Sequence, residues 1–184
     1  MTTNDPRKTE LIQILREKSV RRGDFTLASG KKSDLYVDVR QTSLHARGAQ
    51  LIGELILSSI NTDVVGVGGM TMGADPIACS AAALSSLTDR PIHAFLIRKE
   101  PKGHGTSLPV EGLANLPKGS KVALLEDTTT TGGSLLKAIV AAEAAGLDVV
   151  QQITIVDRQE GAAEMLLAKG YPLHALTTRE ELLA

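Results

Sequence analysis

Two adjacent acids followed by a hydroxyl-rich turn form the most chemically suggestive stretch of the chain. Glu126 and Asp127 directly follow the apolar run Val122–Leu125, and the segment Thr128–Ser134 (TTTTGGS) comes next. Backbone N–H groups that open a helix favour an anion, because they lack partners and lie at the positive end of the helix dipole. Threonine and serine hydroxyls add donors, and glycines let a ligand approach the backbone closely. We therefore expect a phosphate-binding turn over Thr128–Ser134.

The acid pair suits a different part of the same ligand. Carboxylates accept hydrogen bonds from the hydroxyls of a polyol, or bind a Mg²⁺ ion that the ligand carries. A sugar phosphate would satisfy both halves of the stretch. The P-loop pattern and the glycine fingerprint of dinucleotide-binding folds are both missing from it. The simpler alternative is a solvated pair of acids at a strand end, followed by a β-prone run of threonines.

The elements around this stretch predict an α/β fold. Apolar runs typical of strands alternate with amphipathic helical stretches along the chain. We expect two short strands around a Ser-Gly turn over 23–40, strands at 63–69, 91–100, 120–127, 148–158 and 172–178, and helices at 5–21, 45–60, 73–87, 132–146 and 160–170. This alternation favours a central, mainly parallel sheet flanked by helices. Ligands of such sheets bind beyond the carboxyl ends of the strands, where the acid pair would lie.

Composition narrows the class of protein. The 184 residues are 42% hydrophobic and 22% charged with a net charge of -1, which fits one globular domain over 1–184 and gives no sign of nucleic-acid or membrane binding. The single cysteine, Cys79, excludes an internal disulfide, and no apolar run is long enough to span a membrane. No His/Cys cluster predicts a metal bound by the protein itself. We expect a cytoplasmic protein.

A long basic segment stands apart from this regular pattern. Residues 98–120 (RKEPKGHGTSLPVEGLANLPKGS) contain four glycines and three prolines and show no clear periodicity. Loops of this length in compact domains are usually lids, binding loops or disordered segments. Arg98, Lys99, Lys102 and His104 would place positive charge on it, although a solvated charged loop is the simpler interpretation.

Four motifs together resemble one enzyme family. Residues 123–134 (ALLEDTTTTGGS) are similar to the phosphoribosyl pyrophosphate (PRPP) motif of the type I phosphoribosyltransferases. Residues 25–38 (FTLASGKKSDLYVD), 98–105 (RKEPKGHG) and 156–162 (VDRQEGA) resemble the N-terminal signature, the catalytic loop and the orotate-binding strand end of the orotate phosphoribosyltransferases. This resemblance implies the type I fold, with a small N-terminal hood over about 1–40 and a flexible catalytic loop over about 98–118.

The resemblance also implies a reaction and its participants. Orotate and PRPP would give orotidine 5′-monophosphate and pyrophosphate in pyrimidine biosynthesis, with Mg²⁺ carried in by PRPP. The family works as a homodimer with shared sites, so Lys99, Lys102 and His104 would act on PRPP bound by the neighbouring subunit, and Arg98 would contact pyrophosphate in its own chain. Lys102, Glu126 and Asp127 are the implied catalytic residues. The implied PRPP-binding set is Arg98, Lys99, Lys102, His104, Glu126, Asp127, Thr128, Thr129, Thr130, Thr131, Gly132, Gly133 and Ser134.

The base and the leaving group have implied contacts of their own. Thr130 and Arg158 match the orotate-binding residues of the family, and the planar guanidinium of Arg158 suits a carboxylate. Read alone, Arg158 could equally form a surface ion pair. Tyr36 could pack near the base, and main-chain donors over Met70–Gly73 would contact pyrophosphate.

The chain departs from the family pattern at two positions, and two other functions compete with catalysis on orotate. Some members carry a lysine where this chain has Ala28, and another in the loop that reads MTMGADP here. The first rival is a purine phosphoribosyltransferase on the same fold. The second is a regulator that retains the PRPP site without catalysis. The loop RKEPKGHG argues against the first, and the lack of a basic patch or spare domain argues against the second.

Overall fold

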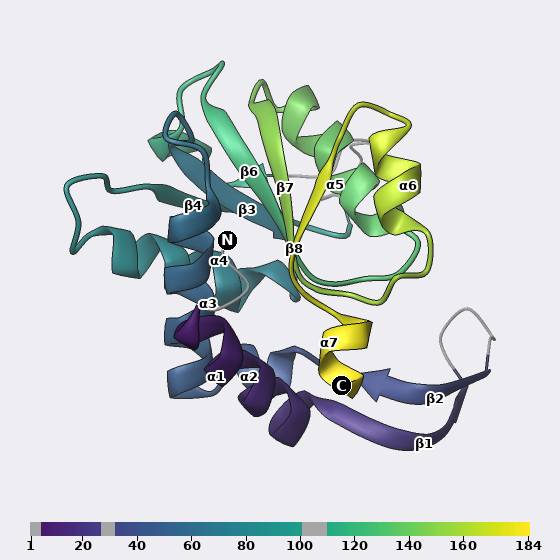
Figure 1. Cartoon of the computed structure of the whole chain (residues 1–184). Coiled ribbons are helices and arrows are strands. Elements are labelled where there is room, and N and C mark those ends of the chain that lie inside the picture. The colour runs from purple at the N-terminus through teal and green to yellow at the C-terminus, as the bar shows by residue number, and fades with distance from the viewer. Residues whose placement is uncertain (1–4, 27–31, 101–109) are drawn as a thin grey trace.

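A six-stranded sheet organises the protein (Figure 1). The computed structural model describes residues 5–26, 32–100 and 110–184. The strand order is β5-β4-β3-β6-β7-β8, with bounds β3 Gly66–Met70, β4 His93–Ile97, β5 Val110–Glu111, β6 Lys121–Thr129, β7 Asp148–Asp157 and β8 Leu173–Thr178. All neighbouring strands pair in parallel except β5, which is antiparallel to β4. The mainly parallel sheet predicted from the sequence is confirmed.

Helices cover both faces of this sheet. The helices of the described residues are α1 Pro6–Ile14, α2 Arg40–Ser43, α3 Ala46–Ser59, α4 Ala74–Ser85, α5 Gly133–Ala144, α6 Ala162–Leu167 and α7 Arg179–Leu183. In Figure 1, α3 and α4 lie on one side of the sheet, and α5 and α6 lie on the other. Buried side chains of β6 alternate between the two cores: Val122 and Leu124 pack with α5, whereas Ala123 and Leu125 pack on the side of α3 and α4. This alternation follows from the period of two along a strand.

The N-terminal segment forms a separate hairpin. Strands β1 (Val20–Thr26) and β2 (Lys32–Val37) pair antiparallel in their own two-stranded sheet, beside α7 in Figure 1. The first helix was predicted to reach Arg21, and this was wrong: α1 ends at Ile14, one π-helical turn follows over Leu15–Ser19 (η1), and Val20 starts a strand. Val20 pairs with Val37, so tertiary pairing of a β-branched residue outweighs the helical period.

Two other boundaries differ from the sequence prediction near the site. Strand β6 continues through Thr129, two residues past the predicted end, because the ten-residue strand β7 pairs with it as far as Asp157. The segment 98–120 was predicted to lack regular structure. Its described part instead contains β5 on the edge of the sheet and a 3₁₀ turn, η2, over Leu113–Asn115.

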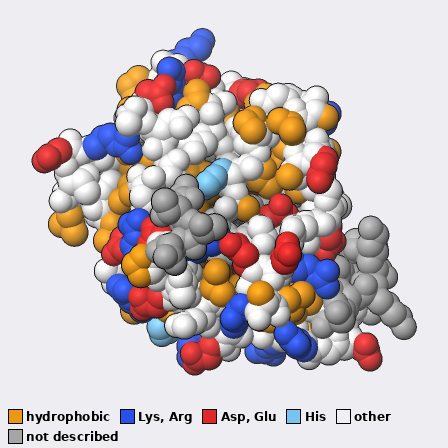
Figure 2. All heavy atoms as spheres, viewed as in Figure 1, with side chains coloured by type: hydrophobic (Ala, Val, Ile, Leu, Met, Phe, Trp, Pro, Cys, Tyr) orange, Lys and Arg blue, Asp and Glu red, His pale blue; other side chains and the backbone are white. Residues whose placement is uncertain are grey.

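The surface carries charges of both signs. Figure 2 shows acidic and basic side chains interspersed on this face, in keeping with the net charge of -1. Among the described residues, no helix combines the length and the apolar character needed to cross a bilayer.

Candidate active site

A crevice opens where β3 and β6 part. These strands pair from Gly66 and Val122 up to Gly68 and Leu124, whereas β6 stays paired with β7 to its end. The chain also reverses its direction of strand addition here, because β4 lies on one side of β3 and β6 on the other. Such a switch point is the usual ligand site of an open parallel sheet. On the β3 side, the residues of β6 from Glu126 onward therefore border the crevice and not a strand.

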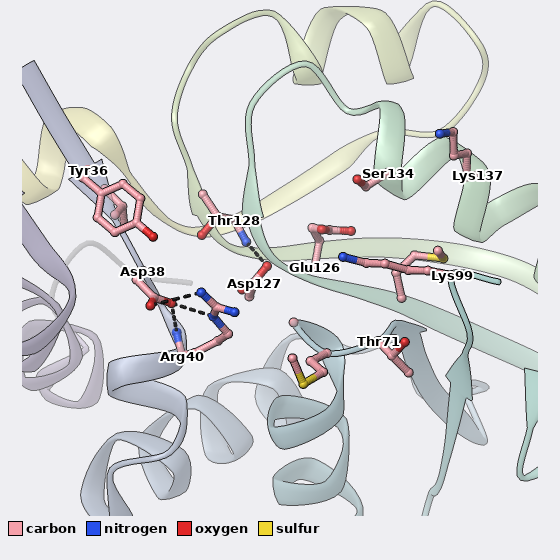
Figure 3. Close-up of a pocket in the computed structure, with 14 residues that line it drawn as sticks. Tyr36, Asp38, Arg40, Thr71, Lys99, Glu126, Asp127, Thr128, Ser134 and Lys137 are labelled. Carbon is pink, nitrogen blue, oxygen red and sulfur yellow. Dashed lines mark hydrogen bonds and ion pairs between the residues drawn. The ribbon is translucent and has the colours of Figure 1, made fainter. Parts of the chain in front are cut away.

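The crevice holds a cavity of about 500 Å³ (Figure 3). It is lined by the end of β2 and the start of α2 (Tyr36, Val37, Asp38, Arg40), the β3–α4 loop (Met70, Thr71, Met72, Gly73), Lys99 after β4, and Glu126, Asp127, Thr128, Ser134 and Lys137 from β6 and α5. Asp127 lies directly against the start of α4, since a Cβ on Gly73 would come within 2.6 Å of its Oδ1. Glycine at this position lets the acid pack against the helix.

The β3–α4 loop offers fewer free main-chain donors than the sequence suggested. The Thr71 N–H already donates to the carbonyl of Ile97 at 2.9 Å. The peptide bond between Thr71 and Met72 is cis. Of the predicted donors over Met70–Gly73, the Thr71 N–H is thus engaged within the sheet.

The threonine–glycine turn forms a second, smaller cavity beside the first. This cup has a volume of about 260 Å³ and is lined by Glu126, Thr128, Thr129, Thr130, Thr131, Gly132, Gly133, Ser134, Leu135 and Lys137. Gly132 caps α5 with a φ of 80°, a left-handed conformation that favours glycine, and an added Cβ would also displace the flexible end of Met165. A Cβ on Gly133 would meet nothing within 4 Å. The first turn of α5 therefore opens onto the cup, as the sequence predicts.

The two acids are buried beside one another, and this changes their ionisation. Burial, reinforced by the charge of Asp127 and opposed by that of Lys99, raises the pKa of Glu126 to about 8. Burial also raises the pKa of Asp127, whereas a hydrogen bond from the Thr128 N–H at 2.8 Å and the charge of Arg40 lower it. Glu126 therefore holds a proton at neutral pH, and Asp127 has the better support for a negative charge.

The ion pair between Arg40 and Asp38 places a positive charge near Asp127. Arg40 donates from Nε to Asp38 Oδ1 at 2.7 Å and from Nη2 to Asp38 Oδ2 at 3.2 Å. These bonds lower the pKa of Asp38 and hold the guanidinium near Asp127 (Figure 3). Tyr36 lies above the pair, and its ring packs on Phe25 with a centroid distance of 5.5 Å. The hairpin thus carries an aromatic ring to the cavity, and the start of α2 carries a fixed cation there.

Several residues predicted for the site lie outside the two cavities or outside the part of the chain that the structure describes. Lys102 and His104 fall outside the described residues. Arg98 lies 3.7 Å from Glu111 of β5 and does not line either cavity. Arg158 lies at the end of β7, where its N–H donates to the Thr129 carbonyl.

The Arg158 side chain is buried, with 7% exposed, and its Nη2 pairs with Glu160 Oε1 at 2.9 Å. Arg158 lines neither of the two cavities. The ion pair that the sequence allowed as an alternative is therefore present, although its arginine is buried and only Glu160 reaches the surface.

Sequence reasoning missed three charged side chains that line the main cavity. Asp38 ends the N-terminal signature and Arg40 lies two residues beyond it, and the Asp-x-Arg spacing was a signal that could have been read as an internal ion pair. Lys137 lies three residues after Ser134, so the helical period places both on one face of α5.

One atom of the acid pair is ready to accept a ligand. Glu126 Oε2 is buried and has no hydrogen-bond partner within the described parts of the chain, which is costly unless a ligand satisfies it. Among the described residues, no group of three or more His, Cys, Asp or Glu side chains could hold a metal ion. The acid pair suits ligand hydroxyls or an ion that arrives with its own ligands.

Comparisons with known proteins first define the class. No protein-family model matches the chain. A crystal structure of a phosphoribosyltransferase from Corynebacterium diphtheriae superposes with a TM-score of 0.81 at 40% identity and covers 98% of this chain and 100% of its own. The fold and the crevice are therefore those of a phosphoribosyltransferase.

The particular family follows from closely similar sequences and structures. The orotate phosphoribosyltransferase of Rhodopseudomonas palustris is 44% identical over 179 residues, which is 96% of each protein. The Mycobacterium tuberculosis orotate phosphoribosyltransferase, solved in complex with PRPP, has a TM-score of 0.74 at 36% identity and covers 97% of this chain and 100% of its own. The chain belongs to the orotate phosphoribosyltransferase family.

Proposed function

We propose that the protein transfers ribose 5-phosphate from PRPP to orotate, a step of pyrimidine biosynthesis in the cytoplasm. One observation supports this most directly: the main cavity and the cup adjoin and share Glu126, Thr128, Ser134 and Lys137. A single sugar phosphate can therefore present its hydroxyls to the acids and its 5′-phosphate to the turn. The membership of the chain in the orotate phosphoribosyltransferase family supports the same substrates.

The chemistry requires positioning and charge more than a nucleophilic side chain. N1 of orotate forms a bond to C1′, the bond between C1′ and the pyrophosphate oxygen breaks with its electron pair on pyrophosphate, and the N1 proton leaves to water. Positive charge develops on the ribose and negative charge on the leaving group. Donors and cations fixed before the reaction stabilise such charges efficiently.

The acid pair is proposed to hold the ribose. Ionised Asp127 accepts from one hydroxyl, and Glu126, protonated at neutral pH, can both donate and accept through its carboxyl. The charge of Asp127 also favours a ribose that becomes more positive as the leaving group departs. The same carboxyls suit hydroxyls better than phosphate, which assigns the phosphate to the cup.

The cations are proposed to act on pyrophosphate. Lys99 enters the cavity opposite the acids (Figure 3). Arg98, Lys102 and His104 complete the basic segment, and Lys102 is the residue for which we propose the catalytic role. Mg²⁺ is proposed to enter bound to PRPP, since it prefers phosphate oxygens and water to a protein cage.

The base is proposed to lie between the hairpin and the end of β7. Tyr36 offers a ring face, Thr130 a hydroxyl, and Arg158 a guanidinium for the carboxylate of orotate. In the ligand-free protein Glu160 is paired with Arg158, so orotate would join or replace that carboxylate.

A second copy of the chain is proposed to complete the site. An apolar groove of about 640 Å³ adjoins the main cavity, shares Asp38, Arg40 and Met72 with it, and also contains Leu44, Pro76 and Cys79. Leu44 and Met72 are 74% and 67% exposed, which is unusual for large apolar side chains beside a polar site. A homodimer would cover the groove and bring the basic segment of one subunit to the PRPP of the other.

The test is a direct assay with base selectivity built in. Purified protein is mixed with PRPP, Mg²⁺ and orotate, and loss of orotate absorbance is followed, with adenine, hypoxanthine and uracil assayed in parallel. We expect turnover of orotate that requires all three components and that is lost in Lys102→Ala while PRPP binding is retained. Turnover of another base instead, or tight PRPP binding without turnover of any base, would overturn the proposal.

A further inference from the structure

Lys137 is a cation that the family motif does not explain. It lines both the main cavity and the threonine–glycine cup, together with Ser134 one turn earlier on α5. Figure 3 shows the two side chains side by side on this helix, above Glu126 and Lys99. Side chains of a helix lean toward its N-terminus. The ammonium group of Lys137 therefore covers the turn that opens onto the cup.

The surroundings of Lys137 leave its charge without a counter-charge. It forms no ion pair with any residue that the structure describes. The first turn of α5 contains no acidic residue. A lysine whose ammonium lies over a helix N-terminus adds to the positive end of the helix dipole, and this arrangement is unfavourable until an anion binds.

The three carboxyls in the main cavity do not compensate for it. Asp38 is held by Arg40, and Asp127 accepts from Thr128. Burial keeps Glu126 largely protonated at neutral pH. An anion in the cup would instead contact the ammonium of Lys137, the threonine and serine hydroxyls and the N–H groups of α5 together.

We propose that Lys137 is a substrate-binding residue that contacts the 5′-phosphate of the ribose in the cup. This inference rests on the proposed function, because it takes PRPP as the ligand. It assigns Lys137 to the part of PRPP that does not react, whereas Lys99 and the basic segment serve the leaving group. The expected result of losing Lys137 is thus weaker binding with little change in the chemical step.

The experiment separates the two ends of the ligand. The affinities of ribose 5-phosphate and of pyrophosphate are measured by titration calorimetry for the unaltered protein, Lys137→Met and Lys137→Arg. Charge-assisted hydrogen bonds support a loss of about tenfold in ribose 5-phosphate affinity for Lys137→Met. Pyrophosphate affinity should stay unchanged, and Lys137→Arg should retain most of the ribose 5-phosphate affinity. In turnover, the KM for PRPP should rise while kcat and the KM for orotate hold.

A matched control tests whether the loss of any lysine charge weakens ribose 5-phosphate binding. Lys169 is an exposed lysine just past the end of α6 and lines neither cavity, so Lys169→Met should leave every affinity unchanged. Equal ribose 5-phosphate affinity in Lys137→Met and the unaltered protein would overturn the inference alone. The same holds for a loss that Lys169→Met reproduces, or a loss confined to pyrophosphate. Failure of the unaltered protein to bind ribose 5-phosphate would instead refute the proposed function.

Discussion

Replacing Glu126 with glutamine is expected to stabilise the ligand-free protein while it weakens PRPP binding. Burial, reinforced by Asp127, raises the pKa of Glu126 from 4.5 to about 8. Between these values the folded protein keeps a proton that the unfolded chain has lost. The free energy of unfolding therefore falls as pH rises through this interval, because the unfolded state binds fewer protons. Glutamine does not ionise, so the variant should not lose this stability as the pH rises.

The magnitude follows from the size of the interval. At about 1.4 kcal/mol per pKa unit, the interval from 4.5 to about 8 corresponds to at most about 5 kcal/mol above pH 8. Structural relaxation and water entry reduce the penalty of a buried charge. We expect the free energy of unfolding of Glu126→Gln to be higher than that of the unaltered protein by about 1–3 kcal/mol near pH 8.5. Near pH 5 the difference should be less than about 1 kcal/mol.

Urea unfolding of both proteins near pH 5, 7 and 8.5 measures this difference. The control is Glu164→Gln, which removes an exposed carboxyl on α6 and should show no such trend. Ribose 5-phosphate titrations on the same samples should show weaker binding by Glu126→Gln. A stability difference that is constant across pH, or a variant that is less stable near pH 8.5, would refute the assignment of a buried, protonated carboxyl.

Three further outcomes are expected. Gly132→Ala should lower the free energy of unfolding by about 1 kcal/mol in urea titrations, because a φ of 80° is strained for any residue with a side chain. Gly133→Ala, which has open space and no positive φ, should unfold like the unaltered protein, and equal losses would contradict the geometry. Arg158→Gln should raise the KM for orotate about tenfold or more and leave the KM for PRPP unchanged; an unchanged orotate KM would remove it from the base site. Leu44→Asp should shift sedimentation velocity from dimer to monomer, and an unaltered protein that sediments as a monomer would contradict the proposed interface.

The sequence by itself determined the contiguous parts of the site. Glu126, Asp127 and the turn that follows are adjacent in the chain, so their order and the start of the next helix can be read without tertiary information. Strand period explains why four consecutive apolar residues, Val122–Leu125, were recognisable as a strand buried on both faces. The same reading gave the α/β class and the mainly parallel sheet, because both depend on local periodicity.

Tertiary structure decided everything that depends on distance through space. Pairing with β7 carried β6 on to Thr129, and the separation of β3 from β6 beyond Leu124 opened the cavity. Burial set the pKa of Glu126, and the packing of α2 beside the end of β6 brought the charge of Arg40 near Asp127.

The role proposed for Lys137 became visible for the same reason. Its position on α5 could be predicted from the helical period, but the two cavities that it lines are formed by segments far apart in the chain. Solvation and Coulomb energies depend on these non-local neighbours, whereas periodicity and motif order depend on the chain alone.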